Sequence, residues 1–271
     1  MNFVGTVFAV HIVITSLTPM EDNEIHNQPD EQLQDRHTDS GFTFHWLQLL
    51  IGAGICYYWF YQSWTSMLAL VLVVIIHELG HVAAGRMFGC RIDEMQVFLL
   101  CFASYKPKPK RGSWWRNITW SLGTLPLGGF TMFKIRPDDQ PIDPGQAAAS
   151  PYINDKPAWQ RLLISAGGVL FNFATFLIIY LLFHFPIGWS QILWRVMSMS
   201  LILAVLNILP VYPLDGGAII FACYEMVTGR KPSQQFATAC GAVGFILIIL
   251  FFWVFPGWVH QIIDSVFGLF F

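Results

Sequence analysis

The stretch VLVVIIHELGH, residues 71–81, joins six consecutive aliphatic residues to two histidines and a glutamate. The apolar run extends on both sides, so a helix over residues 66–88 is long enough to cross the roughly 30 Å of hydrocarbon in a bilayer. Residues four apart share one face of a helix, which lets His77 and His81 reach a single metal ion. The stretch predicts a membrane-spanning helix that carries a metal site.

Glu78 completes an HExxH pattern, in which the glutamate lies beside the water held by a zinc ion and accepts its proton. The alternative is that His77 and His81 are core residues hydrogen-bonded to neighbouring helices. Ionisable groups at membrane depth carry a large desolvation cost, and they are functional by default. This cost favours the metal site over the structural interpretation.

A catalytic zinc site commonly uses three protein ligands and keeps its fourth position open, so one ligand must come from elsewhere in the chain. The string NILPVYPLDGG at residues 207–217 contains two helix-breaking prolines and two glycines that allow a turn. Interrupted backbone at membrane depth is tolerated where it lines a polar cavity or is buried in protein. We therefore predict Asp215 as the third ligand, the alternative being that it caps the following helix.

Composition indicates an integral membrane protein: 55% of the residues are hydrophobic and 12% are charged, against about 25% charged in a soluble domain. The net charge of −2 gives no reason to expect nucleic-acid binding. We predict an all-α polytopic fold with five to six transmembrane helices, the sixth candidate being residues 1–18. The five principal spans are predicted at residues 45–62, 66–88, 160–185, 192–210 and 239–258.

The basic residues predict the orientation, because nine of the 15 Lys and Arg residues fall between residues 89 and 159. Loops rich in these residues stay in the cytoplasm, so loop 89–159 is predicted to be cytoplasmic. Two stretches in it, Ile92–Phe102 and Leu125–Phe133, are too short to span and predict a small membrane-associated β hairpin or sheet. Lys106 to Arg116, with two tryptophans, favours contact with anionic lipid.

Three segments of the chain are predicted. Residues 1–44 form an N-terminal segment whose acidic part, residues 20–42, has too little apolar surface to order itself. Residues 45–258 form the membrane domain with the metal site. Residues 259–271 form a short tail, and the oligomeric state is not predicted.

HELGH at residues 77–81 and NILPVYPLDGG at residues 207–217 together resemble the two signatures of the site-2 protease family of intramembrane zinc metalloproteases. The resemblance implies one zinc ion held by His77, His81 and Asp215, with Glu78 as the catalytic glutamate. It also implies hydrolysis of peptide bonds in or near transmembrane segments of membrane-protein substrates. The predicted connection at 186–191 is too short for the PDZ domain of many bacterial members, and no CBS domain follows, so we expect a minimal member.

The resemblance extends to two further regions. Ala166 to Asn172 resembles an AGP-type motif followed by asparagine, so Asn172 and also Asn207 could donate a hydrogen bond to an oxyanion or to substrate backbone. The alternative is that each amide joins neighbouring helices. Pro126 to Phe130 resembles the family's membrane-associated β region, whose edge pairs with extended substrate. Alternatively, Gly128 and Gly129 only form a turn.

Overall fold

The computed structural model describes five stretches of the chain. Predictions for residues 1–18, for most of the acidic segment 20–42, for the connection 186–191 and for the tail 259–271 lie outside them. The described stretches are residues 41–60, 64–108, 117–136, 149–182 and 191–254.

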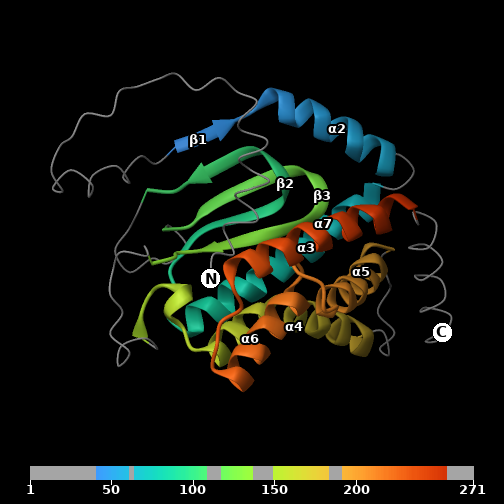
Figure 1. Cartoon of the computed structure of the whole chain (residues 1–271). Helices are drawn as coiled ribbons and strands as arrows, with labels where there is room; N and C mark the ends of the chain where they lie inside the picture. Colours follow the sequence, from blue (N-terminus) through green and yellow to red (C-terminus); the bar gives the residue numbers. More distant parts are fainter. Residues whose placement is uncertain (1–40, 61–63, 109–116, 137–148, 183–190, 255–271) are drawn as a thin grey trace, which may run out of the picture.

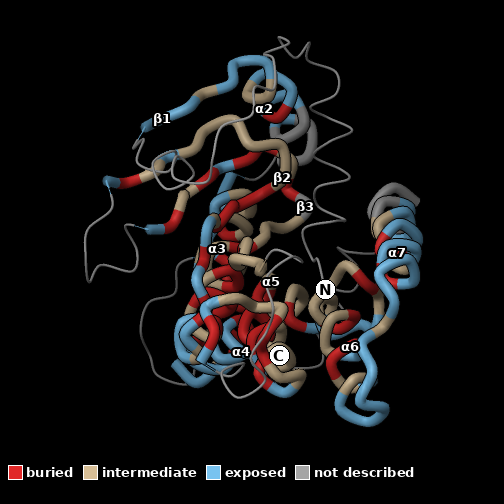
Figure 2. The backbone as a smooth tube through the Cα atoms, turned by 60° about the vertical axis from the view of Figure 1, so that its left-hand side comes forward, coloured by how far each residue is buried: buried red, intermediate tan, exposed pale blue. Residues whose placement is uncertain are grey.

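A helical bundle carries the core, with α3 (Trp64–Met87) at its centre against α4 (Ala158–Leu182) and α5 (Gln191–Ile208). The buried side chains of α3 recur every three or four residues and meet those of the other two helices. Figure 2 shows the buried positions concentrated where these helices meet. The core includes Ala69, Val73, Phe176, Val196 and Met197.

These same three helices are long and apolar enough to cross a membrane. They confirm the helical, apolar nature of three predicted spans, at 66–88, 160–185 and 192–210. The other two predicted spans fall on α2 (Trp46–Phe60) and α7 (Gln234–Val254). With 15 residues, α2 is only about 22 Å long, shorter than the hydrocarbon layer. The total of five to six spans therefore stays a prediction.

The outer face of α4 is covered with exposed large apolar side chains. A continuous apolar surface of this kind is unfavourable in water and is typical of a membrane-facing or partner-facing helix. It agrees with the bilayer-spanning interpretation of the helix. The exposed residues are Leu170, Phe171, Phe173, Leu177, Ile178 and Leu181.

A three-stranded sheet lies between α2 and α3, in the order β1 (Gly41–Phe44), β2 (Ile92–Lys106), β3 (Thr119–Phe133) (Figure 1). The predicted strands were too short, because β2 extends to Lys106 and β3 begins at Thr119. Both long strands bend, so that residues 94–97 of β2 pair with residues 119–122 and also with residues 129–132 of β3. The second half of β3 thereby becomes the outer part of the sheet.

The first strand, β1, was not predicted, because residues 41 and 42 were included in the acidic N-terminal segment. They pair in antiparallel register with Lys106 and Tyr105 of β2. Backbone pairing with an existing strand supplies hydrogen bonds that local composition does not reveal.

Two short helical elements complete the described chain: η4 (Ile153–Asp155), which precedes α4, and α6 (Asp215–Thr228). An ion pair between Arg161 of α4 and Glu225 of α6 joins the two helices, and both side chains are largely buried. The helix α6 ends at Gly229, whose φ of 68° is the left-handed conformation that suits glycine at this position. Its first residue is the predicted third ligand.

Candidate active site

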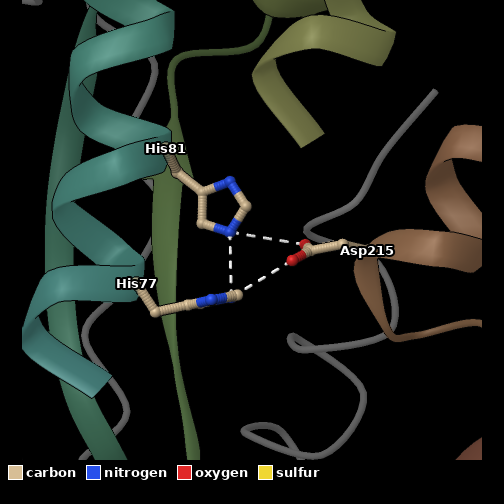
Figure 3. Close-up of side chains that lie close together, drawn as sticks. All are labelled: His77, His81 and Asp215. Carbon is tan, nitrogen blue, oxygen red and sulfur yellow. Dashed lines mark hydrogen bonds and ion pairs between the residues drawn. The ribbon is translucent and has the colours of Figure 1, made fainter. Parts of the chain in front are cut away.

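His77, His81 and Asp215 come together in one cluster, as Figure 3 shows. Nε2 of His77 lies 3.2 Å from Nε2 of His81. The carboxylate of Asp215 faces both rings, with Oδ2 3.1 Å from His77 Nε2 and Oδ1 3.3 Å from His81 Nε2. Both histidines are buried and Asp215 is nearly so. Two segments separated by more than 130 residues therefore meet at one point.

Asp215 reaches this point because α5 ends at Ile208 and the chain turns back on itself. Pro210 has no backbone N–H, so the helix cannot continue regularly through it. The first turn of α6 then packs directly on the connecting loop. A Cβ at Gly216 would lie 2.1 Å from the carbonyl oxygen of Leu209, and a Cβ at Gly217 would lie 2.4 Å from the nitrogen of Tyr212. The two glycines are required for this close approach.

The histidine helix is held against α4 by a second close approach. A Cβ at Gly80 would lie 2.3 Å from the carbonyl oxygen of Gly167, and a Cβ at Gly167 would lie 2.5 Å from that of Gly80. One residue further along α4, Gly168 lies directly against both imidazoles, because a Cβ there would be 2.5 Å from His81 Nε2. The backbone of α4 thus forms one wall of the cluster.

The three side chains fit a zinc ion in spacing. Nitrogen and oxygen ligands about 2.0–2.1 Å from zinc at tetrahedral angles lie about 3.3–3.4 Å from one another. The two imidazole nitrogens are 3.2 Å apart, and each has a different oxygen of Asp215 close to it, at 3.1 Å from His77 and 3.3 Å from His81. Two imidazoles and a carboxylate are also ligands that zinc accepts at a catalytic site.

The hydrogen bonds around the cluster also favour a cation. Nδ1 of His81 lies 2.9 Å from the carbonyl oxygen of Ile164, which can only accept, so Nδ1 carries the hydrogen. In the neutral ring, Nε2 then presents a lone pair to the carboxylate of Asp215. Oδ2 of Asp215 is itself buried and accepts no hydrogen bond within the described residues. The lone pairs of His81 Nε2 and of the Asp215 oxygens thus face each other, and a positive ion between them would stabilise this arrangement.

Glu78 is almost completely buried beside this cluster and is held by β3. The hydroxyl of Thr131 donates a hydrogen bond to Oε2 of Glu78 over 2.8 Å. A Cβ at Gly129 would lie 3.0 Å from Oε1 of Glu78, so the missing side chain leaves room for the carboxylate. Sequence reasoning missed Thr131, because a threonine in a predicted strand carries no signal of its partner.

The four residues predicted to bind substrate or an oxyanion fall in different places. The Asn172 side chain is fully buried, with Nδ2 3.2 Å from Nδ1 of His77. Asn207 donates to the carbonyl oxygen of Leu203, one turn earlier in its own helix. Gly128 has a φ of 109°, which requires glycine, and open space around its Cα, while Gly129 lies against Glu78. Asn172 and Gly129 therefore adjoin the cluster, whereas the hydrogen bond of Asn207 lies within its own helix.

Comparisons with known proteins give the family to which this chain is similar. The sequence profile of Peptidase family M50 matches residues 65–188 and 184–251. A metalloprotease of Caulobacter vibrioides is 28% identical over 42% of this chain and 31% of its own length. A zinc metalloprotease of Methanocaldococcus jannaschii is 23% identical over 69% of this chain and 43% of its own length. The chain thus spans less than half the length of these curated relatives.

A solved structure, a site-2 protease from Methanocaldococcus jannaschii, aligns over 83% of both chains with 20% identity and a TM-score of 0.47. The family profile covers far more than half of the chain and includes both HELGH and the loop that ends at Asp215. The chain therefore belongs to peptidase family M50, and the resemblance to site-2 proteases in its sequence is confirmed.

Proposed function

We propose that this chain is a zinc-dependent intramembrane endopeptidase that cleaves peptide bonds in or near the transmembrane segments of membrane proteins, as in regulated intramembrane proteolysis. The observation that carries the proposal is the convergence of His77, His81 and Asp215 next to Glu78, on and beside a helix apolar enough to cross a membrane. Relatives named as zinc metalloproteases support the same metal.

Zinc held by these three residues would polarise a substrate carbonyl and acidify water at the open position. Glu78 is placed to accept the proton of the attacking water and to pass it to the departing amine. The bond from Thr131 fixes one carboxylate oxygen and leaves the other available for this transfer. Burial of the cluster excludes competing bulk water and strengthens each of these electrostatic interactions.

The second half of β3 is the surface that we propose for substrate binding. Residues 129–133 pair with β2 on one side, and no other described strand pairs with them on their second side. Gly129 and Thr131 of this edge also contact Glu78. A substrate segment added as a further strand would lie extended beside the catalytic glutamate, whereas a helical substrate has to unwind before its carbonyls are accessible.

The bilayer positions of the site and of its partners are part of the proposal. His77 lies about 14 Å along α3 from the basic residue Arg86, and under the positive-inside rule this supports a site in the cytoplasmic half of a cell or inner membrane. The partners are a transmembrane substrate and membrane lipid. Of the basic lipid-contact segment, residues 109–116 lie outside the described residues.

Metal analysis and cleavage assays on the same purified protein test the proposal. We expect about one zinc per chain and cleavage of at least one member of a panel of single-span substrates in proteoliposomes. The variant Glu78→Gln should keep its zinc and lose activity by about a hundredfold or more. Zinc uptake without cleavage by the parent would indicate a metal carrier or an inactive scaffold. Cleavage by Glu78→Gln at the parental rate would remove Glu78 as the base.

A further inference from the structure

The amide of Asn172 makes a contact that leaves one of its atoms without a partner. Nδ2 lies 3.2 Å from Nδ1 of His77, on the side of the ring away from the ligand atom Nε2. Oδ1 is buried and has no hydrogen-bond partner within the described residues. An unpaired carbonyl oxygen in a fully buried side chain is unfavourable, so its position next to a ligand histidine needs an explanation.

The two histidines differ in the groups that hold their Nδ1 atoms. His81 faces the carbonyl oxygen of Ile164, which only accepts, so its Nδ1 must donate and its Nε2 is always free to bind a metal. His77 faces an amide, which has a donor at one end and an acceptor at the other. The structure therefore fixes the tautomer of His81 and leaves the tautomer of His77 open.

The two orientations of the Asn172 amide have opposite consequences for His77. With Nδ2 toward the ring, Nδ2 donates to Nδ1 of His77 and the ring hydrogen lies on Nε2, where it faces Oδ2 of Asp215 at 3.1 Å and Nε2 of His81 at 3.2 Å. In this arrangement Nε2 of His77 carries a hydrogen and cannot bind zinc.

Turning the amide by 180° exchanges its two ends with little change in shape, because the oxygen and the NH2 group are nearly the same size. Oδ1 then accepts a hydrogen bond from Nδ1–H of His77, and the lone pair of Nε2 is available to the metal. Histidines that bind metals generally donate their other N–H in this way. The second orientation is therefore the one that fits a loaded site.

We propose that Asn172 is a positioning residue whose amide oxygen accepts a hydrogen bond from Nδ1–H of His77 and so keeps the lone pair of His77 Nε2 available for zinc. The proposal rests on the zinc site of the proposed function. It differs from the prediction that Asn172 donates a hydrogen bond to an oxyanion, which stays a prediction, because the contact of Asn172 is with the ring nitrogen remote from the ligand cluster.

Three variants test this role through zinc affinity, measured by competition with a chromophoric chelator. Asn172→Leu keeps the approximate volume and removes both polar ends, so affinity should fall about 10- to 100-fold, as for other groups that orient metal ligands. Asn172→Asp can only accept from Nδ1–H of His77, so affinity should equal or exceed that of the parent. Asn207→Leu is the matched control and should bind zinc like the parent, because its amide bonds within its own helix.

Parental affinity in Asn172→Leu would overturn the positioning role while leaving the zinc site intact. A loss of tenfold or more in Asn172→Asp would also overturn it, and this variant tests the role even if Asn172→Leu fails to fold. Absence of zinc binding by the parent would instead remove the zinc site of the proposed function, and the positioning role with it. Nitrogen-15 NMR of the histidine-labelled, zinc-loaded protein should show a hydrogen on Nδ1 of His77 whose signal shifts in Asn172→Leu; an unshifted signal would contradict the hydrogen bond to Asn172.

Discussion

Substituting alanine for Gly168 should expel the metal from the site, although it adds only one methyl group. The new Cβ would lie 2.5 Å from Nε2 of His81, and 2.6 and 2.7 Å from Cε1 and Nε2 of His77. Ordinary contacts of a Cβ begin at 3.4 Å, so both imidazoles must move away from α4 by the better part of an ångström. The methyl group therefore acts on both ligand nitrogens at once.

The size of this displacement decides the outcome. Zinc–ligand distances in working sites stay within about 0.2 Å of their preferred values, several times less than the movement that the methyl group demands. The helices cannot easily separate instead, because Gly80 and Gly167 hold their backbones in contact. We expect zinc affinity to fall about 100-fold or more, at or beyond the upper end of effects from residues that only orient the ligands.

The assay is zinc content by mass spectrometry, together with chelator competition, on purified Gly168→Ala and on the matched control Gly54→Ala. Gly54 lies in α2 with open space where its Cβ would be, so the control should bind zinc like the parent. Alanine is favoured over glycine within a helix by about 1 kcal/mol, so helix loss would not explain a zinc defect. Parental zinc affinity in Gly168→Ala would refute the close approach of α4 to the two imidazoles.

Two further substitutions test contacts outside the ligand set. Thr131→Val removes the hydroxyl that donates to Glu78 and should lower kcat about tenfold or more at unchanged zinc content. Thr131→Ser keeps a hydroxyl and should have the parental kcat. A parental kcat in Thr131→Val would show that this hydrogen bond does not support Glu78 in catalysis. Burial raises the pKa of Asp155, but hydrogen bonds from Arg136 and Ser150 outweigh this and hold the pKa below its ordinary value. The charged form is thus favoured by folding, and its contribution is present above the unfolded pKa of about 3.9 and lost as pH falls through the lower folded pKa. Asp155→Asn should therefore lower the Tm in detergent at pH 7, with the difference from the parent shrinking below pH 4; a constant difference would contradict this.

The sequence predicted the metal cluster because its signals are local. The spacing of His77 and His81 is set by helical geometry, and the prolines and glycines around Asp215 specify a turn before any tertiary contact is known. The structure then brings these residues together. Apolar runs likewise predicted α3, α4 and α5 as candidate spans, since hydropathy over about 20 residues reports directly on the solvent that a helix prefers.

The remaining features depend on how distant elements meet. The bond from Thr131 to Glu78 requires the register of two bent strands. In β2 the positive φ angles are at Phe98 (66°) and Leu100 (57°), residue types that do not signal a bend. The position of Asn172 behind His77 requires the rotation of α4 about its axis, which Gly80 sets through its contact with the backbone of α4. The chain contains other residues of the same types, so residue type alone could not single these positions out.

The central claim is that one zinc ion is held by His77, His81 and Asp215, and zinc K-edge X-ray absorption of the purified protein tests it most directly. We predict nitrogen and oxygen scatterers at about 2.0–2.1 Å, with the outer-shell signal of two imidazoles, and loss of bound zinc in Asp215→Ala. Sulfur scatterers at about 2.3 Å, or an unchanged zinc spectrum and content in Asp215→Ala, would contradict the claim.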